Sequence, residues 1–558
     1  MLLTGAEILV RSLIDQGVDT IFGYPGGAVL NIYDALYMHQ DELRHVLTCH
    51  EQGAAHAADG YARSTGKVGV CLATSGPGAT NLVTGIATAY IDSIPMVAIT
   101  GNVTNALLGK DSFQEVDIKG ITMPITKHNY IVKNVEELEE TIREAFFIAQ
   151  DGRPGPVLID IPKDVTANKA EYVEYVPKKV TPKENTIKEA DLAQAIKLIN
   201  ESKKPFIYAG GGVKISSACK EVKELADKIG APVATSLMAM DSISNDFPLY
   251  TGMIGMHGTK ASNLAATKCD LLIAIGARFS DRVISSQNHI KNAKVLHIDI
   301  DPAEINKNIK VDASVIGDAK IIVEKLLSRV DAKRNQEWLD KIEDIKKANL
   351  PKEESEALTP KYLFDKLNEM NDKGNIIIST EVGQHQMWAA QYFNFKKSRS
   401  FVTSGGLGTM GFGLGASIGV QVGNPDCQVI NIAGDGSFGM NNNEIATAVS
   451  NKLPLIMIII NNGVLGMVRQ WQDLFYEKRY SHTTLNRKTD FVKLAEAHGA
   501  KGYRVTKKEE LDKVLKEAFE SKEPVLIDYI IDMDKKAFPM VAPGAPIDNI
   551  ITEEDFEK

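Results

Sequence analysis

Short runs of apolar residues alternate with longer amphipathic stretches along the whole chain. Residues 68–73, 205–209 and 453–460 are clear examples of such runs, and polar residues or glycine bound each of them. Continuous apolar runs of this length are typical of strands buried on both faces of a parallel sheet. Because amphipathic stretches separate the runs, the pattern predicts repeated βαβ units. We therefore expect an α/β protein whose sheets are mainly parallel and flanked by helices.

Two polar stretches divide this pattern into three blocks. They span residues 166–185 and 331–359, and we expect an exposed helix over 341–347. A chain of 558 residues is long enough for roughly three to four domains. The first and third blocks show the same alternation, although no residue-level repeat relates them. The further strands that we predict are 96–100, 271–275, 295–299, 376–378 and 429–432, and the domains that we predict are 1–168, 186–330 and 358–558.

Composition narrows the classes of function. Apolar residues make up 44% of the chain and charged residues 24%, which is ordinary for a globular protein. The formal net charge of −9 argues against nucleic acid as a partner. The five cysteines are scattered and form no CxxC pair, so we expect neither a zinc site nor a disulfide framework. Since no apolar stretch reaches the ~20 residues of a membrane span and the first residues show no targeting pattern, we expect a cytoplasmic protein with no membrane partner.

The clearest chemical signal lies around Asp435. Residues 434–437 read Gly-Asp-Gly-Ser, a composition that lets the backbone approach phosphate groups closely, and Asn462 follows the last long apolar run. Because open α/β sheets bind ligands at the carboxyl ends of their strands, we expect these residues to meet at one sheet edge. Carboxylate and amide oxygens suit Mg²⁺, and phosphate oxygens would complete its shell. The pattern resembles the thiamine diphosphate motif, which implies a magnesium-bound diphosphate.

Other segments extend this resemblance. Residues 49–63 look like the activating-glutamate segment of thiamine diphosphate enzymes, and residues 405–411 look like the segment that binds the aminopyrimidine ring of the cofactor. Over nearly the whole chain the best match is the catalytic subunit family of acetohydroxyacid synthases, also called acetolactate synthases. Each matching segment is weak alone, but together they are specific. They are residues 22–27, 112–115, 127–130, 255–258, 276–282 and 466–471.

The resemblance implies which residues activate the cofactor. Glu51 is the carboxylate that would hydrogen-bond the aminopyrimidine ring and favour the tautomer that deprotonates the thiazolium carbon. Met410 is the wedge that would hold the cofactor bent, because an unbranched side chain fills irregular gaps. Gly408 would offer its carbonyl group to the aminopyrimidine.

The resemblance also implies the ligands of the diphosphate and the metal. Asp435, Asn462 and the main-chain carbonyl of Val464 would bind Mg²⁺. Many relatives have an acidic or polar residue in place of Val464, a difference that is harmless only if the ligand is the backbone. The residues implied to bind the diphosphate end are Gly383, Gln384, His385, Gly434, Asp435, Gly436, Ser437, Asn462, Gly466 and Met467.

In this family a unit from one 2-ketoacid, pyruvate, is joined to a second 2-ketoacid, pyruvate or 2-ketobutyrate. Arg282 matches the position that anchors the carboxylate of the second substrate, a task that suits a guanidinium with two parallel donors. Trp471 and Met467 match the pocket wall that favours 2-ketobutyrate, whose extra methyl group is worth ~1–3 kcal/mol. Without the resemblance, the alternative for Arg282 is an exposed ion-pair partner of Asp281, and the alternative for Trp471 is a packing residue. The residues that match the access path of the substrate are Phe113, Gln114 and Lys127.

The middle block looks like a dinucleotide-binding domain. Three glycines at 210–212 follow a predicted strand, which suits a close approach of backbone to phosphate, but the GxGxxG spacing is missing. The family binds FAD here without using it for net redox chemistry, and a vestigial domain without nucleotide is the alternative. The residues implied to contact FAD are Arg153, Gly210, Gly211, Gly212, Thr235, Leu237, Met256, His257, Gly276, Arg278, Asp299 and Asp318.

The resemblance favours a biosynthetic, FAD-containing acetolactate synthase that serves isoleucine and valine biosynthesis. The alternatives are a pyruvate oxidase with a redox-active flavin, a FAD-independent catabolic acetolactate synthase, and a non-catalytic nucleotide-binding subunit. Glyoxylate carboligase is disfavoured because that family lacks an acid at the position of Glu51. The resemblance also implies an active site shared between two chains, hence a homodimer or homotetramer, and a separate small regulatory subunit.

Overall fold

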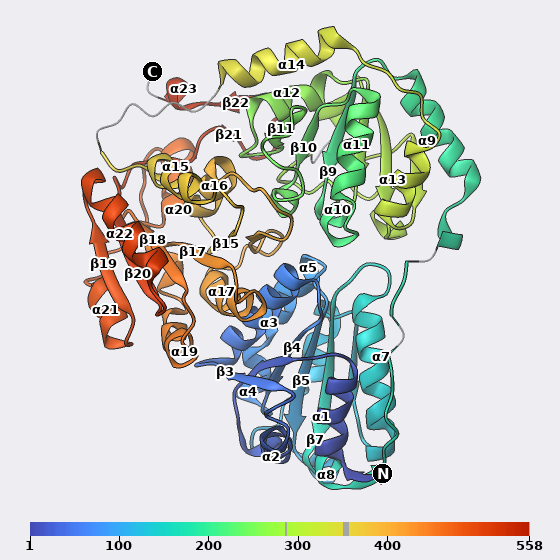
Figure 1. The fold of residues 1–558 in the computed structure, drawn as a ribbon, viewed down its shortest axis with the longest axis vertical. Coiled ribbons are helices and arrows are strands. Elements are labelled where there is room, and N and C mark those ends of the chain that lie inside the picture. The colour runs from blue at the N-terminus through green and yellow to red at the C-terminus, as the bar shows by residue number, and fades with distance from the viewer. Residues whose placement is uncertain (178, 183, 285–286, 350–356, 557–558) are drawn as a thin grey trace.

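The computed structural model describes residues 1–177, 179–182, 184–284, 287–349 and 357–556, and these form three α/β domains (Figure 1). Each domain contains a six-stranded sheet in which every strand pair is parallel, with helices against the sheet. This confirms the predicted fold class. The exact domain boundaries remain predictions, and parts of both polar stretches and the last two residues of the third predicted domain lie outside the described residues.

The N-terminal sheet has the strand order β3-β2-β4-β5-β7-β6. Two of its predicted strands, 68–73 and 96–100, correspond to β4 and β5. Its strands are β2 (Thr20–Gly23), β3 (Arg44–Leu47), β4 (Gly69–Ala73), β5 (Met96–Asn102), β6 (His128–Ile131) and β7 (Pro156–Pro162), and its helices include α1 (Gly5–Asp15), α2 (Leu30–Met38), α3 (Glu51–Thr65), α4 (Pro77–Asn81), α5 (Val83–Ile91) and α7 (Leu138–Gln150).

The C-terminal sheet has the order β16-β15-β17-β18-β20-β19, which repeats the order of the N-terminal sheet strand for strand. The two domains therefore share one topology, and α3 and α17 follow equivalent strands. The strands are β15 (Ile376–Thr380), β16 (Phe401–Val402), β17 (Gln428–Gly434), β18 (Ile456–Asn461), β19 (Lys501–Val505) and β20 (Val525–Ile530), and the helices include α15 (Pro360–Met370), α16 (Gln384–Tyr392), α17 (Phe412–Gly423), α18 (Asp435–Phe438), α20 (Gly466–Phe475), α21 (Phe491–Ala497) and α22 (Lys508–Glu520).

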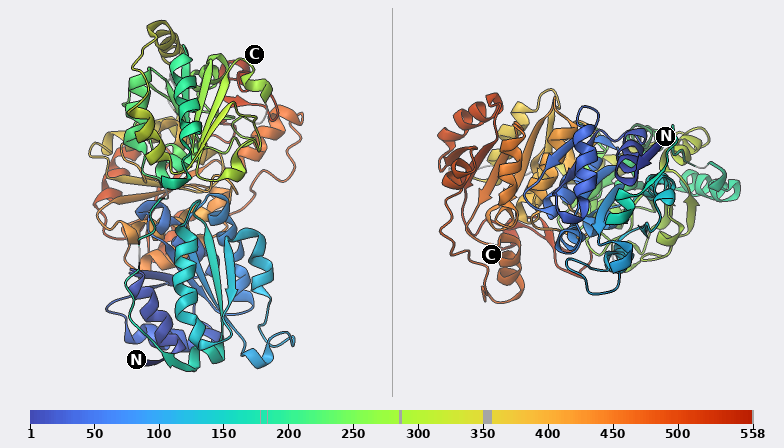
Figure 2. Two further views of the ribbon diagram at one scale, coloured as in Figure 1. Left: turned by 90° about the vertical axis from the view of Figure 1, so that its right-hand side faces the viewer. Right: turned by 90° about the horizontal axis from the view of Figure 1, so that it is seen from below.

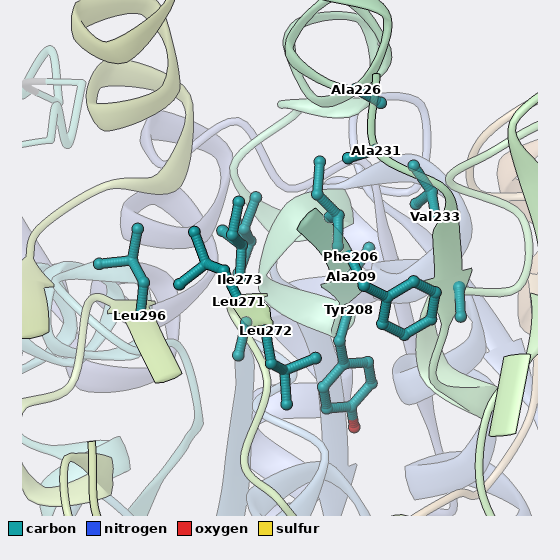
Figure 3. Packing of buried hydrophobic residues seen from close by; sticks show 14 of the residues in the cluster. Phe206, Tyr208, Ala209, Ala226, Ala231, Val233, Leu271, Leu272, Ile273 and Leu296 are labelled. Atoms are coloured by element: carbon teal, nitrogen blue, oxygen red, sulfur yellow. The ribbon is translucent and has the colours of Figure 1, made fainter. Parts of the chain in front are cut away.

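The middle sheet has a different order, β11-β10-β9-β12-β13-β14. Numbered within the domain this is 3-2-1-4-5-6, the order of the doubly wound dinucleotide-binding fold. Phe206, Tyr208 and Leu272 lie in its closely packed core (Figure 3). The strands are β9 (Pro205–Ala209), β10 (Val233–Thr235), β11 (Tyr250–Met253), β12 (Leu271–Ile275), β13 (Lys294–Asp299) and β14 (Ala313–Ile316), and the helices include α9 (Glu189–Glu201), α10 (Gly211–Ile215), α11 (Cys219–Ile229), α12 (Lys260–Lys268), α13 (Ala319–Leu327) and α14 (Gln336–Ala348).

The N-terminal and C-terminal domains meet where α3 packs against α17 (Figure 1). A Cβ atom on Gly419 would lie 1.8 Å from the carbonyl oxygen of Ala57, and one on Gly60 would lie 2.2 Å from that of Ala416. The two helix backbones thus approach each other more closely than side chains allow. A single hydrophobic cluster runs through both domains at this contact, so the two domains share one core.

Two expectations need correction, and the polar stretch 166–185 contains a strand that was not predicted, since β8 (Lys169–Glu171) pairs antiparallel with β1 (Leu2–Thr4). The helix expected over 341–347 belongs to α14, which buries Trp338 and Ile342 against the middle domain and is not simply exposed. The strand expected over 453–460 begins only at Ile456, and Pro454 has no N–H group to pair.

The C-terminal segment returns to the middle domain. The backbone N–H of Val541 donates to the carbonyl of Met256 over 2.8 Å, and Ile547 is buried in the middle core. Figure 2 shows the middle domain at the opposite end of the molecule from the N-terminal domain. Across the described ranges, no helix is both long and apolar enough to cross a membrane.

Gly419→Ala should destabilise the protein, because the new Cβ atom would meet backbone that cannot move independently. Overpacking of this kind costs about 1–3 kcal/mol. The measurement is the midpoint of thermal unfolding. Gly27→Ala is the matched control, since no atom lies within 4 Å of its added Cβ. Equal midpoints for the two variants would contradict the close contact between α3 and α17.

Candidate functional site

The predicted magnesium ligands lie at the carboxyl edge of the C-terminal sheet. Strands β17 and β18 are adjacent and parallel, with Gly434 opposite Ile460, so Asp435 and Asn462 each follow the end of one strand. Both side chains are more than nine-tenths buried. Burial raises the pKa of Asp435 to about 6, although the backbone N–H groups of Asp435, Gly436 and Gly463 oppose the shift. A buried carboxyl group in this position fits a bound cation.

Among the described residues, no group of three or more His, Cys, Asp or Glu side chains could hold a metal ion. A magnesium ion beside Asp435 would therefore depend on amide, backbone and cofactor oxygens. Val464 is buried, and its N–H donates to the Asn462 Oδ1 over 3.3 Å. Val464 lies opposite Thr484 in an isolated antiparallel bridge. The hydrogen bonds of this bridge run from the Leu465 N–H to the Thr483 carbonyl and from the Leu485 N–H to the Gly463 carbonyl, so they do not use the Val464 carbonyl.

His385 provides a donor beside this edge. Its ring packs against Gly434, where a Cβ atom would lie 2.7 Å from Nδ1, so only glycine fits. Burial lowers the pKa of His385 to about 3, which keeps the ring neutral. The Nε2 atom is buried without a hydrogen-bond partner among the described residues. A neutral imidazole carries one N–H, and in the tautomer that has it on Nε2 this atom fits a phosphate oxygen that the protein does not supply.

Gln384 has a different arrangement. Its Oε1 accepts from the Asn462 Nδ2 over 3.3 Å, and its Nε2 donates to the Gln470 Oε1 over 2.8 Å. The Gln384 side chain thus holds the Asn462 amide group in one orientation. A direct contact of Gln384 with the diphosphate stays a prediction.

The segment around Met410 belongs to the C-terminal domain and contacts the N-terminal domain. The Thr409 hydroxyl is 2.7 Å from that of Thr88 on α5, and the Thr409 N–H donates to the Ser404 Oγ over 3.0 Å. Met410 itself is half-buried, and Gly408 is exposed with a φ of +67°. A carbonyl on an exposed, left-handed glycine is accessible to a ligand, as the predicted contact requires.

Glu51 is the first residue of α3 and is almost fully buried. Its Oε2 accepts from the Asn81 Nδ2 over 2.9 Å. The Glu444 carboxylate receives the N–H groups of Cys49 and His50 over 3.2 and 3.0 Å, which fixes the start of the helix. No hydrogen bond or ion pair recorded among the described residues joins Glu51 to the segments 408–410 or 434–437 of the same chain.

The predicted substrate residues Arg282 and Trp471 lie together across two domains. The guanidinium carbon of Arg282 is 5.8 Å from the centre of the Trp471 ring, and its NH1 is 3.5 Å from the Asp281 carboxylate. The Trp471 Nε1 is buried without a partner in the described part of the chain. Met467 precedes Trp471 by four residues on α20, so both side chains are on one helix face. This places a guanidinium group beside an apolar wall, and the role of both towards substrate stays a prediction.

The residues of the access path are in the N-terminal domain. Phe113 is 87% exposed, and Gln114 adopts a φ of +57° against the turn at Gly76. The Lys127 ammonium group donates to the carbonyls of Ile148 and Asp151 at the end of α7, and burial lowers its pKa to about 8. The structure therefore gives Lys127 a helix-capping position, and its role towards substrate stays a prediction.

The predicted FAD residues gather along the carboxyl edge of the middle sheet. Gly210 begins the turn after β9, and a Cβ atom there would lie 2.1 Å from the Gly276 carbonyl oxygen. Ligands of doubly wound sheets bind in this crevice. The residues placed at or just beyond strand ends are Gly210, Gly211, Gly212, Thr235, Leu237, Met256, His257, Gly276, Arg278, Asp299 and Asp318.

Several of these residues already have protein partners. Arg153 donates to Asp301 over 3.1 Å and to Glu304 over 2.8 Å, and Asp318 caps α13 by accepting from Lys320 N–H over 3.0 Å. Burial lowers the pKa of His257 to about 4, so its ring is neutral. The strand order and the glycine turn fit a nucleotide, while the contacts of each residue with FAD stay predictions.

Sequence reasoning missed two buried acids that hold the Met410 segment. Asp92 accepts from the N–H groups of Gly405 and Gly406 over 3.1 and 2.8 Å, and it pairs with buried Arg63 at 3.1 Å. Glu381 accepts from the N–H of Gly411 over 2.7 Å. Neither acid belongs to a recognisable motif, and only the contact between distant segments identifies them.

Three family models match successive parts of the chain. They are "Thiamine pyrophosphate enzyme, N-terminal TPP binding domain" over residues 3–121, "central domain" over 192–326 and "C-terminal TPP binding domain" over 381–529. Thiamine pyrophosphate is the same compound as thiamine diphosphate. Each model covers strands of a different sheet, so the three matches follow the three domains.

Curated relatives match almost end to end. A "Probable acetolactate synthase large subunit" of Methanocaldococcus jannaschii is 50% identical over 98% of this chain and 95% of its own length. The "Acetolactate synthase large subunit" of Corynebacterium glutamicum is 47% identical over 97% of this chain and 89% of its own length. The "Acetolactate synthase" of Mycobacterium bovis is 46% identical over 98% and 91%. The family predicted from the sequence is confirmed: the chain belongs to the thiamine pyrophosphate enzymes and, within them, to the acetolactate synthase large subunits.

Proposed function

We propose that the protein is a biosynthetic acetolactate synthase. It decarboxylates pyruvate and joins the remaining two-carbon unit to pyruvate or 2-ketobutyrate, giving 2-acetolactate or 2-aceto-2-hydroxybutyrate. The observation that carries the acceptor half of this proposal is the contact between Arg282 and Trp471, an anchor for a carboxylate directly beside an apolar wall. The names of the relatives support the same reaction.

Thiamine pyrophosphate, when bound, supplies the acidic carbon and the electron sink that decarboxylation of a 2-ketoacid needs. Glu51 would bind the aminopyrimidine end through its carboxylate, which Asn81 already holds in one orientation. A hydrogen bond that strengthens as the ring changes tautomer stabilises the activated state over the resting state. Met410 would enforce the bend between the two rings of the cofactor.

The pyrophosphate end would be held at the edge of the C-terminal sheet. Asp435, Asn462 and the Val464 carbonyl would share a Mg²⁺ ion with the pyrophosphate oxygens, and the His385 Nε2 would donate to one of them. Buried donors and ligands that are fixed before binding cost little reorganisation when charge moves.

Arg282 and Trp471 would select the second substrate. The guanidinium group binds the carboxylate in two-point geometry, and the indole ring packs against the alkyl group. The additional methyl group of 2-ketobutyrate gains ~1–3 kcal/mol there relative to pyruvate. The branched-chain amino acid pathway consumes both products, and we propose that role for the enzyme.

We also propose that FAD occupies the crevice of the middle domain and that two chains complete each active site. The 3-2-1-4-5-6 strand order and the turn at Gly210 support nucleotide binding. No hydrogen bond joins Glu51 to the pyrophosphate segment within the described part of one chain, which supports a homodimer as the minimum unit, with Phe113 covered by the partner. The large-subunit name of the relatives supports a small regulatory subunit as a further partner.

The direct test of the proposed function is product identification. Purified protein is given pyruvate and 2-ketobutyrate with thiamine pyrophosphate and Mg²⁺, with and without FAD. We expect both acetohydroxy acids and a flavin absorbance that pyruvate does not bleach. Acetate with flavin reduction in step with turnover would instead indicate a pyruvate oxidase. Full activity of a colourless protein would indicate a FAD-independent enzyme.

Glu51→Gln should bind thiamine pyrophosphate and remain folded while carboligation falls by about 10²–10⁴-fold, the range for loss of a proton-transfer partner. Cofactor binding is measured by titration and turnover by acetolactate formation at saturating cofactor. Glu7→Gln, at a half-buried capping position of α1, is a control for loss of a glutamate charge. Undiminished turnover of the Glu51 variant would remove Glu51 from the proposed role.

Trp471→Leu should reduce the preference for 2-ketobutyrate over pyruvate by about tenfold or more, because the flat apolar wall is lost. Pyruvate self-condensation should persist, since the Arg282 anchor remains. The measurement is the ratio of the two products in competition. An unchanged ratio would reject Trp471 as the selecting residue.

A further inference from the structure

Glu381 lies directly after β15 and is completely buried. Its Oε2 accepts from the Gly411 N–H over 2.7 Å and from the Ser437 hydroxyl over 2.9 Å. Its Oε1 accepts from the Leu414 N–H over 3.0 Å. A single carboxylate thus joins two segments that are separated along the chain.

The first segment is the start of α17. Gly411 occupies the position before this 12-residue helix and has no side chain that could cap it. The free N–H groups of a helix N-terminus need acceptors, and a negative charge there is favourable. Glu381 supplies both from a neighbouring strand. Burial raises the pKa of the Glu381 carboxyl, and the Ser437 hydroxyl and the N–H groups of Leu414 and Gly411 oppose that shift. In the ionised form of Glu381 each of these hydrogen bonds is stronger than a neutral one.

The same contact fixes the backbone next to Met410. Gly411 follows Met410 directly, and the Asn441 Nδ2 holds the Gly411 carbonyl over 2.7 Å. On the other side, Thr409 is bound to Ser404 and Thr88. The backbone on both sides of Met410 is thus fixed, while its side chain remains half-buried.

The second segment is the run 434–437 that would bind the pyrophosphate. Ser437 is its last residue and donates its hydroxyl to Glu381. The Gly411 N–H also lies 3.3 Å from the Ser437 Oγ, so the three groups meet at one point. Met410 and Asp435 are therefore held at a constant spacing through Glu381.

We propose that Glu381 is a positioning residue that sets the spacing between the Met410 wedge and the pyrophosphate segment, and thereby the bend of the bound cofactor. This inference rests on the proposed cofactor site. Glu381 acts through Gly411 and Ser437 and does not itself touch the cofactor. A carboxylate is required because its oxygens face two N–H donors and one hydroxyl, and an amide would turn an NH₂ group towards at least one of them.

The experiment compares Glu381→Gln with Glu381→Asp in the full-length protein. The Kd for thiamine pyrophosphate is measured at saturating Mg²⁺ by fluorescence titration, and the near-ultraviolet circular dichroism of the bound cofactor reports its ring geometry. Asp490→Asn is the matched control. Asp490 also caps a helix of the same domain, α21, but contacts no predicted cofactor segment.

Glu381→Gln should raise the Kd at least about tenfold, the ratio that corresponds to about 1.4 kcal/mol. It should also alter the dichroism and lower kcat at saturating cofactor with little change in the KM for pyruvate. Glu381→Asp keeps the charge on a shorter side chain and should show smaller changes in the same direction. Asp490→Asn should lower the unfolding midpoint while its Kd and dichroism match the wild type.

Wild-type Kd and dichroism in folded Glu381→Gln would overturn the inference. If that variant does not fold, Glu381→Asp decides in the same way. The affinity and dichroism readouts do not require carboligation, so the two proposals fail separately. A wild type that binds the cofactor without making acetolactate contradicts only the proposed function, whereas a Glu381 variant that behaves like Asp490→Asn contradicts only this inference.

Discussion

The packing of α3 against α17 holds the N-terminal and C-terminal sheets in one relation, and the predicted cofactor residues depend on that relation. Helix α3 begins with Glu51, and helix α17 begins just after Met410. The backbones of the two helices touch at Gly60 and Gly419. Because both sheets have the same strand order, the contact joins equivalent faces of two similar domains.

The candidate site combines buried polar groups, two of which have an atom with no hydrogen-bond partner among the described residues. Asp435 is buried, the Nε2 of His385 and the Nε1 of Trp471 have no partner among the described residues, and Phe113 is almost fully exposed. Burial of unpaired polar atoms is unfavourable for folding alone. The unpaired atoms lie where cofactor, metal and substrate are expected. A dense hydrogen-bond network next to them, which includes Asp92 and Glu381, offsets their unfavourable free energy.

Much of this could be predicted from the sequence. Apolar runs such as 205–209 and 271–275 coincide with β9 and β12 because strands buried on both faces leave a continuous apolar signal. The short edge strands β3 and β16 were missed, since β3 is partly exposed and β16 has only two residues. The meeting of Arg282 with Trp471 followed from resemblance, not from spacing. Glu381 could not be found, because its partners are 30 or more residues away and no local pattern marks a buried carboxylate.

The central claim is that each catalytic site combines Glu51 of one chain with Asp435 of another. The most direct test mixes two inactive variants, Glu51→Gln and Asp435→Ala, under conditions that allow chains to exchange. Each mixed dimer then contains one site with both residues intact, so random exchange should restore about one quarter of the wild-type activity. A mixture that stays inactive although exchange is verified with tagged chains would show that both residues must come from the same chain, and would contradict the account.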